Sequence, residues 1–468
     1  MKTSAILSAY VAVALCGLFA SAVRADADSD ARARWAAVAH RVAAEGTVLL
    51  KNDNGTLPLG EGESVAVYGG KYRKCGGGSS KVQSSYEISV PEGLRRCGVE
   101  IVKGRADAAV VTLTRGASEG ADAKDEAYGL SEKELGLVET AAAQCGKVVV
   151  VLNTGHLVNV KPLKDNPRVG AILMAWFPGQ EGGAAIAEII TGRVNPSGRL
   201  ADTIAEKIED YPSHRYFREK PLDLDYGEGR DVGYRYFNAK AKDRIVYPFG
   251  HGLSYTTFSE SDEGPADGTG KTLRVTVANT GKTAGRHSVL RYENGELAAY
   301  AKTRLLAPGE SQTLVLKPFD PSVRKGPAPE VADGEIDAVL AKLSIEEKVA
   351  LCSAQPPAMV RGTAGVGNLP RFGFPNEQTA DGPNGVRRYG PSTCHPAGAL
   401  LAQTFDDDLA FETGRALGEE AASLNVDILL GPGLNIHRHP LCGRNFEYFS
   451  EDPLVSGRIA AAYVRGVQ

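Results

Sequence analysis

The sequence contains no long run of basic residues and no strong excess of either charge. Its 53 Lys and Arg are offset by 57 Asp and Glu, which leaves a formal net charge of −4. Nucleic-acid-binding proteins concentrate positive charge on one face, so this composition does not indicate a nucleic-acid partner. The chain is 43% hydrophobic and 24% charged. Both values are ordinary for a soluble globular protein and exclude disordered, collagen-like and coiled-coil classes.

Cysteines are also few for the length of the chain. Of the seven in 468 residues, Cys16 lies in the signal peptide predicted below. The others are too scattered for the dense disulfide framework of a small secreted protein, so disulfides are permitted but no pairing is predicted. These six residues are Cys75, Cys97, Cys145, Cys352, Cys394 and Cys442.

The N-terminus has the features of a secretory signal. Lys2 precedes an apolar stretch over residues 5–22, and small residues mark cleavage sites at Ala20-Ser21-Ala22 and Val23-Arg24-Ala25. We therefore predict that residues 1–25 are a cleaved signal peptide and that the protein is secreted or periplasmic. The alternative is a retained N-terminal anchor, although the stretch is at the short end for spanning a bilayer. No other stretch predicts a membrane span.

The length of the chain predicts about two to four domains. Residues 31–212 alternate strands and helices, and a capping box at Ser131 marks the start of a helix over residues 131–144. Near-continuous apolar strands separated by helices are typical of a parallel sheet that is covered on both faces. The expected strands lie at residues 47–50, 65–68, 108–113, 148–152 and 171–175.

The rest of the chain changes character twice. Residues 213–268 are a connecting segment, and period-two alternation over residues 269–318 predicts a short β-sandwich module. A proline-containing linker over residues 319–332 follows, and from residue 333 the strand and helix rhythm resumes.

Polar side chains gather in two loops that follow predicted strands, where ligands bind in parallel α/β sheets. Glu119 lies among small residues in the loop after residues 108–113 and could donate a proton to a leaving group. Asp381 begins Asp381-Gly-Pro-Asn-Gly-Val-Arg387 and could accept hydrogen bonds from the vicinal hydroxyls of a sugar. The alternatives are a solvated loop carboxylate for Glu119 and an Asp-Gly turn for Asp381.

A third loop, over residues 431–453, follows a predicted strand at residues 425–430 and is the richest in donors, acceptors and aromatic rings. Burying so many polar groups without partners is costly, which favours a binding site. Two alternatives remain open. His437, His439 and Cys442 could bind zinc, although no fourth ligand is evident, or Arg444 and Glu447 could pair internally in a structural clamp. A glycine-rich stretch at residues 76–80 lacks the ending of a phosphate-binding loop and is expected to be only a flexible loop.

The third loop closely resembles the strand-end signature of glycoside hydrolase family 3, of the β-glucosidase type. Residues 381–387 resemble the other barrel signature of that family, residues 44–58, 178–182 and 195–199 its α/β sandwich domain, and residues 232–255 the segment before its fibronectin-like module. The resemblance implies an α/β fold in this order: an α/β sandwich domain, a short fibronectin type III-like β module and the first half of a TIM-type (β/α)8 barrel. This is the circularly permuted order, and residues 333–468 supply 136 residues, whereas a complete barrel needs at least about 200.

The resemblance also implies a reaction. Asp381 and Arg444, with Arg387 and Glu447 in the same signatures, correspond to ligands of the terminal sugar, and Glu119 corresponds to the general acid/base. The expected substrate is a glucoside or β-linked oligosaccharide, cleaved at its terminal non-reducing β-D-glucosyl residue with retention of configuration and without a cofactor or metal.

One catalytic group has no counterpart in this sequence. Neither the family's Ser-Asp-Trp-like motif, which carries the aspartate nucleophile, nor its sugar-binding Lys-His pair occurs in residues 1–468. The nucleophile is therefore expected to be absent from this chain. The alternative functions are an inactive glycan-binding remnant and a β-xylosidase of the same family. Oligomeric state is not predicted.

Overall fold

The structure is a computed structural model that describes most of the chain. The predicted signal peptide and the linker at residues 319–332 lie outside the described residues, as does the only apolar stretch near a membrane-spanning length. None of the helices within the described part combines the length and hydropathy that a bilayer crossing requires. The described residues are 29–219, 225–266, 272–318, 333–352, 363–369, 371, 374–387 and 390–468.

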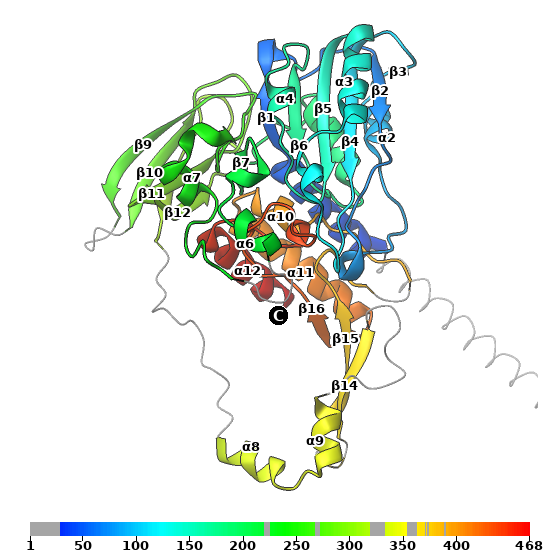
Figure 1. Ribbon diagram of the computed structural model, residues 1–468, viewed down its shortest axis with the longest axis vertical. Coiled ribbons are helices and arrows are strands. Elements are labelled where there is room, and N and C mark those ends of the chain that lie inside the picture. Colours follow the sequence, from blue (N-terminus) through cyan, green and yellow to red (C-terminus); the bar gives the residue numbers. More distant parts are fainter. Residues whose placement is uncertain are drawn as a thin grey trace, which may run out of the picture.

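A six-stranded sheet forms the first half of the molecule (Figure 1). Its spatial order is β1-β6-β5-β4-β2-β3, and the five strands from β6 to β3 are parallel. The sequence predicted this parallel sheet but not that the edge strand β1 runs antiparallel to β6. The strands are β1 (Val48–Asn52), β2 (Val65–Gly69), β3 (Ile101–Val102), β4 (Ala106–Arg115), β5 (Cys145–Thr154) and β6 (Ala171–Met174).

Apolar side chains cover both faces of this sheet, as the near-continuous apolar strands predicted. Val150 and Leu152 of β5 belong to one hydrophobic core, and the intervening Val149 and Val151 belong to another on the opposite face. Helix α3 begins at the predicted capping box, in which Ser131 and Glu134 exchange hydrogen bonds. The helices of this half are a first helix over residues 29–46, α2 (Val90–Arg96), α3 (Glu132–Gln144), α4 (Lys161–Lys164) and α5 (Gly182–Ile190).

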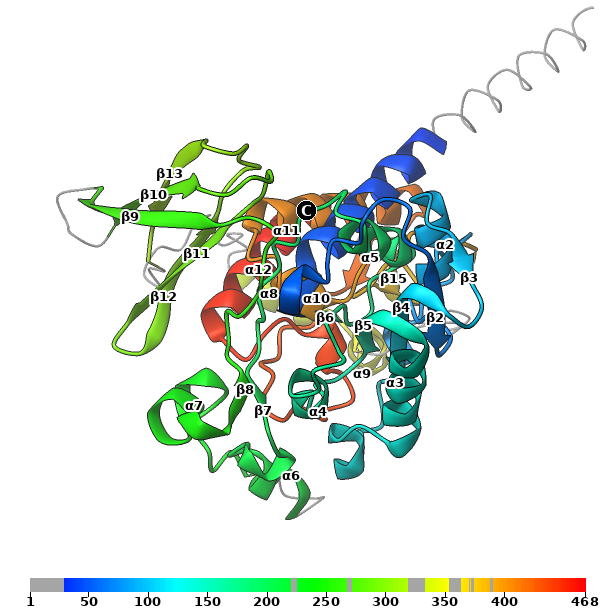
Figure 2. The ribbon, with the colours of Figure 1, turned by 90° about the horizontal axis from the view of Figure 1, so that it is seen from above.

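The middle of the chain forms two small antiparallel sheets beside the large one (Figure 2). Their facing sides share an apolar core that contains Val275, Val289 and Leu314. Strand β9 lies within the segment that the sequence analysis assigned to a connection, so the sheet starts at Phe258 rather than at residue 269. The sheets are β13-β10-β9 and β11-β12, with β9 (Phe258–Pro265), β10 (Leu273–Asn279), β11 (Ser288–Glu293), β12 (Glu296–Lys302) and β13 (Ser311–Leu316).

The connection to these sheets contains short elements only. Strands β7 and β8 pair antiparallel, and helices α6 and α7 lie beside them (Figure 2). The bounds are β7 (Ile204–Ala205), α6 (His214–Glu219), α7 (Tyr234–Lys240) and β8 (Ile245–Tyr247).

The last segment contains a three-stranded sheet and two long packed helices. Strand β14 runs antiparallel to β15, and β15 runs parallel to β16. All strands of a (β/α)8 barrel are parallel, so the antiparallel β14 departs from that pattern, and β15–β16 is the parallel pair among the described strands of this segment. Helices α11 and α12 pack against each other (Figure 1). The elements are α8 (Asp333–Leu340), α9 (Ile345–Leu351), β14 (Thr363–Leu369), β15 (Phe374–Asp381), α10 (Gly398–Ala402), α11 (Asp407–Ser423), β16 (Ile428–Leu430) and α12 (Pro453–Val467).

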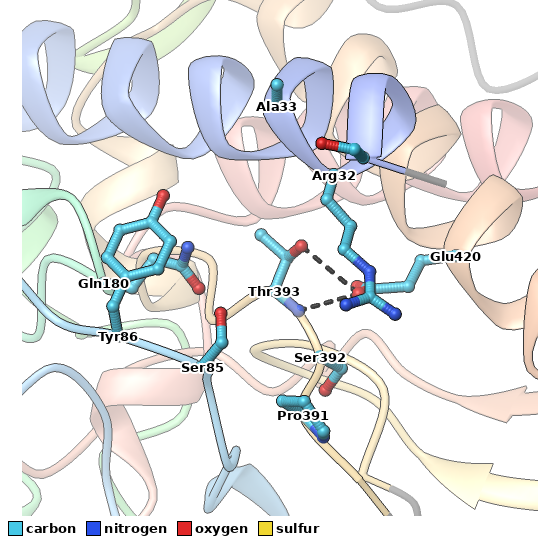
Figure 3. Close-up of a pocket in the computed structure, with 10 residues that line it drawn as sticks. Arg32, Ala33, Ser85, Tyr86, Gln180, Pro391, Ser392, Thr393 and Glu420 are labelled. Carbon is cyan, nitrogen blue, oxygen red and sulfur yellow. Dashed lines mark hydrogen bonds between the residues drawn. The ribbon is translucent and has the colours of Figure 1, made fainter. Parts of the chain in front are cut away.

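Near the C-terminal end of α11, Glu420 faces a polar pocket of about 240 Å³ (Figure 3). Its Oε1 accepts hydrogen bonds from the backbone N–H and the hydroxyl of Thr393, at 2.7 and 3.2 Å. Its Oε2 is buried and has no hydrogen-bond partner within the described residues. Burial raises the pKa of the Glu420 carboxyl to about 7, against the opposing charge of Arg32.

This raised pKa predicts that the stability of the protein falls as pH rises. The folded protein holds the Glu420 proton more tightly than the unfolded chain, whose value is near 4.5. The free energy of unfolding therefore decreases as pH rises from about 4.5 to about 7, by up to about 3 kcal/mol. In urea unfolding, the free energy of unfolding should decrease less between pH 5 and pH 8 for Glu420→Gln than for wild type. Asp408→Asn, which changes an exposed carboxyl of the same helix, should keep the wild-type loss. Equal losses in all three proteins would contradict the prediction.

Candidate active site

Strands β15 and β16 end side by side, so the loops that follow them begin at one edge of the sheet. Asp381, the last residue of β15, is in register with Leu430, the last residue of β16. The N–H of Gly382 donates to the Leu430 carbonyl at 3.1 Å. Both loops follow strands, as predicted, and the structure shows that these two strands are neighbours.

Glu119, from the loop after β4, contacts the loop after β16. Its Oε1 lies 3.2 Å from Nη1 of Arg444, and its Oε2 accepts a hydrogen bond from the Ser79 N–H at 3.0 Å. The side chains of Glu119 and Arg444 are 41% and 38% exposed, so a substrate could reach both. The hydrogen bond from the Ser79 N–H, followed by the positive charges of Arg444 and Arg387, lowers the pKa of the Glu119 carboxyl.

Arg444 also pairs with Glu447, as the structural-clamp alternative predicted. The Arg444 Nε donates to Oε1 of Glu447, which is buried. The other oxygen of Glu447 accepts a hydrogen bond from the Ser80 hydroxyl. Arg444 therefore lies between two carboxylates, one buried and one exposed. The internal pair fixes the guanidinium and leaves its contact with Glu119 in place.

The glycine-rich stretch at residues 76–80 is more than the flexible loop that the sequence predicted. It ends in a short 3₁₀ helix (Gly78–Ser80) whose two serines hold Glu119 and Glu447. A Cβ atom at Gly76 would collide with the ring of Phe446, so the small residue allows the two loops to pack closely. Ser79 acts through its backbone N–H, so the Ser80 hydroxyl was the available signal, and sequence reasoning missed it because Glu447 lies far along the chain.

Asp381 and Arg387 form an ion pair across their tight loop. Nη1 of Arg387 lies 3.0 Å from Oδ2 of Asp381, and the Arg387 N–H donates to the Asp381 carbonyl at 2.8 Å. The loop therefore has the tight turn of the structural alternative together with the predicted acidic side chain. Burial raises the pKa of the Asp381 carboxyl, and Arg387 opposes that rise. The charge of Glu119 also raises the pKa of Asp381, and the charge of Arg444 lowers it.

Backbone contacts fix the Glu119 loop against the loop after β16. The N–H of Gly443 donates to Oδ1 of Asp122 at 2.8 Å, and the N–H of Ala123 donates to the Leu441 carbonyl at 3.0 Å. Both contacts follow Glu119 and precede Arg444 in sequence. They tie the residues just after Glu119 to the residues just before Arg444.

His437 and His439 hold the loop on the rest of the protein instead of forming the zinc site considered above. The Nδ1 of His437 bonds to Asp202 and its Nε2 to the Asn445 carbonyl, both at 2.7 Å. The ring of His439 stacks on Phe217 with centroids 4.0 Å apart. In the part of the chain that the structure describes, no three His, Cys, Asp or Glu side chains form a group that could hold a metal ion.

Glu451 makes a further buried connection. Its carboxylate accepts hydrogen bonds from the Thr203 N–H and hydroxyl at 2.8 and 2.7 Å, and from the Tyr234 N–H at 2.7 Å. The loop after β16 is therefore bonded to the connection that follows the six-stranded sheet. The sequence did not reveal this contact.

Comparison with known proteins identifies two domains of one family in this chain. The glycosyl hydrolase family 3 C-terminal domain matches residues 47–255, and the N terminal domain of that family matches residues 359–468. Beta-glucosidase A from Butyrivibrio fibrisolvens is 31% identical over 91% of this chain and 78% of its own length. A beta-glucosidase from Ruminococcus albus is 29% identical over 92% of this chain and 63% of its own length.

Solved structures agree with the sequence matches. A beta-glucosidase from Paenibacillus barengoltzii superposes with a TM-score of 0.80 at 27% identity, over 92% of this chain and 67% of that one. Beta-glucosidase 3B from Thermotoga neapolitana, solved in complex with alpha-D-glucose, gives a TM-score of 0.53 at 32% identity, over 59% of this chain and 47% of that one.

The fold and the clustered carboxylates and arginines are those of a glycoside hydrolase. This chain belongs to glycoside hydrolase family 3 and is of the β-glucosidase type. The domain named C-terminal in the family precedes the one named N-terminal here, so the predicted permuted order is confirmed.

Proposed function

We propose that this chain binds the terminal non-reducing β-D-glucosyl residue of a glucoside or β-linked oligosaccharide, and that Glu119 is the general acid/base of its hydrolysis. The observation that carries the proposal is the contact between Glu119 and Arg444, because it joins the loop of the acid/base to the loop that holds the sugar. Relatives named as beta-glucosidases, and a neighbour solved with glucose, support the choice of sugar.

The proposed binding residues have complementary chemistry. The carboxylates of Asp381 and Glu447 accept hydrogen bonds from sugar hydroxyls, and the guanidinium groups of Arg387 and Arg444 donate to hydroxyl oxygens. The Asp381–Arg387 and Arg444–Glu447 pairs hold these groups in fixed positions before the sugar arrives. Such preorganisation reduces the entropy lost on binding.

Glu119 must gain a proton before it can act as an acid. In the free site its hydrogen bond from the Ser79 N–H and the charge of Arg444 favour the ionised form. A bound sugar would exclude water from Glu119 and compete with Arg444 for its carboxylate, and both effects raise the pKa. After the leaving group has departed, the ionised carboxylate then serves as the base that activates water.

The nucleophile is proposed to come from outside residues 1–468. A retaining glycosidase needs a second carboxyl about 5–5.5 Å from the acid/base, and the aspartate motif that supplies it in the family does not occur in this sequence. Glycan binding without turnover is the second candidate function, and the same missing motif favours it. Removal of a covalent nucleophile eliminates most of the rate of an enzyme that depends on it.

Three further properties are part of the proposal. Strands β9–β13 form a fibronectin type III-like module, which their two packed antiparallel sheets support. The parallel pair β15–β16 and its helices belong to a partial barrel. The apolar N-terminal stretch with its small-residue cleavage sites supports secretion through a signal peptide at residues 1–25.

Binding and turnover of the purified chain test the proposal separately. Calorimetric titration with D-glucose should show saturable binding, and titration with D-xylose should show weaker binding. Aryl β-glucoside hydrolysis should stay far below the turnover of about 1–1000 per second that is typical of enzymes. Absence of glucose binding would contradict the sugar site. Turnover in that range would contradict an external nucleophile.

A further inference from the structure

Two cysteines that are far apart in the sequence lie together where the two family domains meet. Cys75 belongs to the domain matched by residues 47–255, and Cys394 to the domain matched by residues 359–468. Each thiol affects the pKa of the other. Neither cysteine has a part in the proposed reaction.

One dipeptide holds both cysteine segments in place. The N–H of Gly179 donates to the carbonyl of Lys74 at 3.0 Å, and the N–H of Gln180 donates to the carbonyl of Cys394 at 2.9 Å. The side chain of Gln180 returns a bond, because its Oε1 accepts from the Cys394 N–H at 2.9 Å. Figure 3 shows Gln180 beside Thr393, the residue before Cys394.

Gly179 and Cys394 approach each other closely, and the two cysteine segments make another contact a few residues away. A Cβ atom at Gly179 would lie 2.7 Å from the Cys394 carbonyl oxygen, and the positive φ of +74° also suits glycine. The N–H of Ser392 donates to the Gln83 carbonyl at 2.9 Å. These backbone bonds hold the Cys75 and Cys394 segments close together in a fixed arrangement.

We propose that Cys75 and Cys394 are a disulfide site that covalently joins the two family domains. The oxidant is a small-molecule disulfide such as oxidised glutathione. The Cys75 thiolate attacks one sulfur of that disulfide, which forms a mixed disulfide and releases one glutathione thiolate. This thiolate takes the proton of Cys394, whose sulfur then attacks the Cys75 sulfur and releases the second glutathione. Overall, two cysteine thiols are oxidised and one glutathione disulfide is reduced to two thiols.

The environments of the two thiols suit this order of events. Cys75 is partly exposed and Cys394 is fully buried, so an external disulfide meets Cys75 first. The neighbouring Cys394 thiol and the charge of Lys74 lower the pKa of the Cys75 thiol to about 7, although burial and Glu87 oppose the change. The pKa of the Cys394 thiol is raised. Cys75 is therefore the attacking thiol and Cys394 the resolving one.

The bond would brace the candidate active site. Cys75 immediately precedes the stretch at residues 76–80, which holds Glu119 and Glu447 through Ser79 and Ser80. A link to Cys394 would restrain this stretch against the domain that supplies Asp381 and Arg444. The disulfide closes a very long loop, for which the expected gain in stability is large.

Disulfide mapping of the wild-type chain tests the proposal directly. Protein reduced and then treated with oxidised glutathione should yield, after non-reducing proteolysis, one peptide pair that joins Cys75 to Cys394. Its melting temperature should exceed that of the reduced protein by about 5 °C. Cys75→Ser and Cys394→Ser should remove this redox-dependent difference, and Cys97→Ser, a change at another partly buried cysteine, should retain it.

The outcomes separate clearly. A glutathione adduct on Cys75 without the linked peptide, or linkage of either residue to another cysteine, would overturn the disulfide. A linked peptide without any change in melting temperature would overturn its bracing role. Mapping uses the wild-type protein, so the result does not depend on whether a variant folds.

Discussion

Glu119→Gln is expected to slow hydrolysis of β-glucosides with poor leaving groups by at least about 100-fold. The amide cannot protonate the glycosidic oxygen, and an alkyl or sugar leaving group needs that proton. Activated aryl β-glucosides leave without it, so their rate of glucosyl transfer to the enzyme should fall far less. The comparison requires a form of the protein that turns over, either residues 1–468 or the same sequence within a longer chain.

The matched control is Glu126→Gln, which changes an exposed carboxyl a short distance along the same connection to α3. It should leave both substrate classes unaffected. If Glu119→Gln lowered the rates for poor and good leaving groups by the same factor, Glu119 would not be the acid. A pH profile adds a second readout, because loss of a titrating acid removes the alkaline limb for the poor leaving group.

Asp381→Ala is expected to weaken binding of glucose by at least about 100-fold. The substitution removes a carboxylate that would accept two charge-assisted hydrogen bonds, each with a contribution of about 1.5–3 kcal/mol. It also leaves Arg387 without its ion-pair partner. Calorimetric titration of the variant with glucose gives the change in affinity.

Asp427→Ala is the control for Asp381, because Asp427 is an exposed carboxylate that accepts a hydrogen bond from the Gln378 N–H at 2.7 Å and lies just before β16, at the opposite end of that strand from Asp381. It should retain wild-type affinity. The melting temperature of each variant distinguishes lost binding from lost structure. Unchanged glucose affinity in a folded Asp381→Ala protein would remove Asp381 from the sugar site.

Sequence patterns predicted the local structure well where one short segment contained the whole signal. The predicted capping box at Ser131 marks a helix start in the structure, because its hydrogen bonds join residues three positions apart. The buried parallel strands were equally clear, since β4 and β5 are apolar on both faces. The antiparallel direction of β1 and the inclusion of β9 in a sheet were not predicted, because each depends on a partner strand elsewhere in the chain.

The candidate site likewise contains residues that the sequence predicted and residues that it missed. The motifs at residues 381–387 and 431–453 named four of the proposed sugar ligands, and the loop after β4 named Glu119. Each of these signatures lies within one short stretch, so it can be recognised from the order of residues along the chain. Ser79 and Ser80 were missed, because a glycine-rich loop has many uses and only its contacts with Glu119 and Glu447 reveal this one.

The sequence by itself determined the family, the order of its domains and the chemical types of the proposed ligands. These properties reside in residue identity and spacing along the chain. The tertiary structure decided that Glu119 meets Arg444, that the Ser79 N–H and the Ser80 hydroxyl position the carboxylates, and that the Cys75 and Cys394 segments lie together. Each of these contacts joins segments distant in sequence, and their approach depends on how those segments pack in the folded protein, which local propensity does not encode.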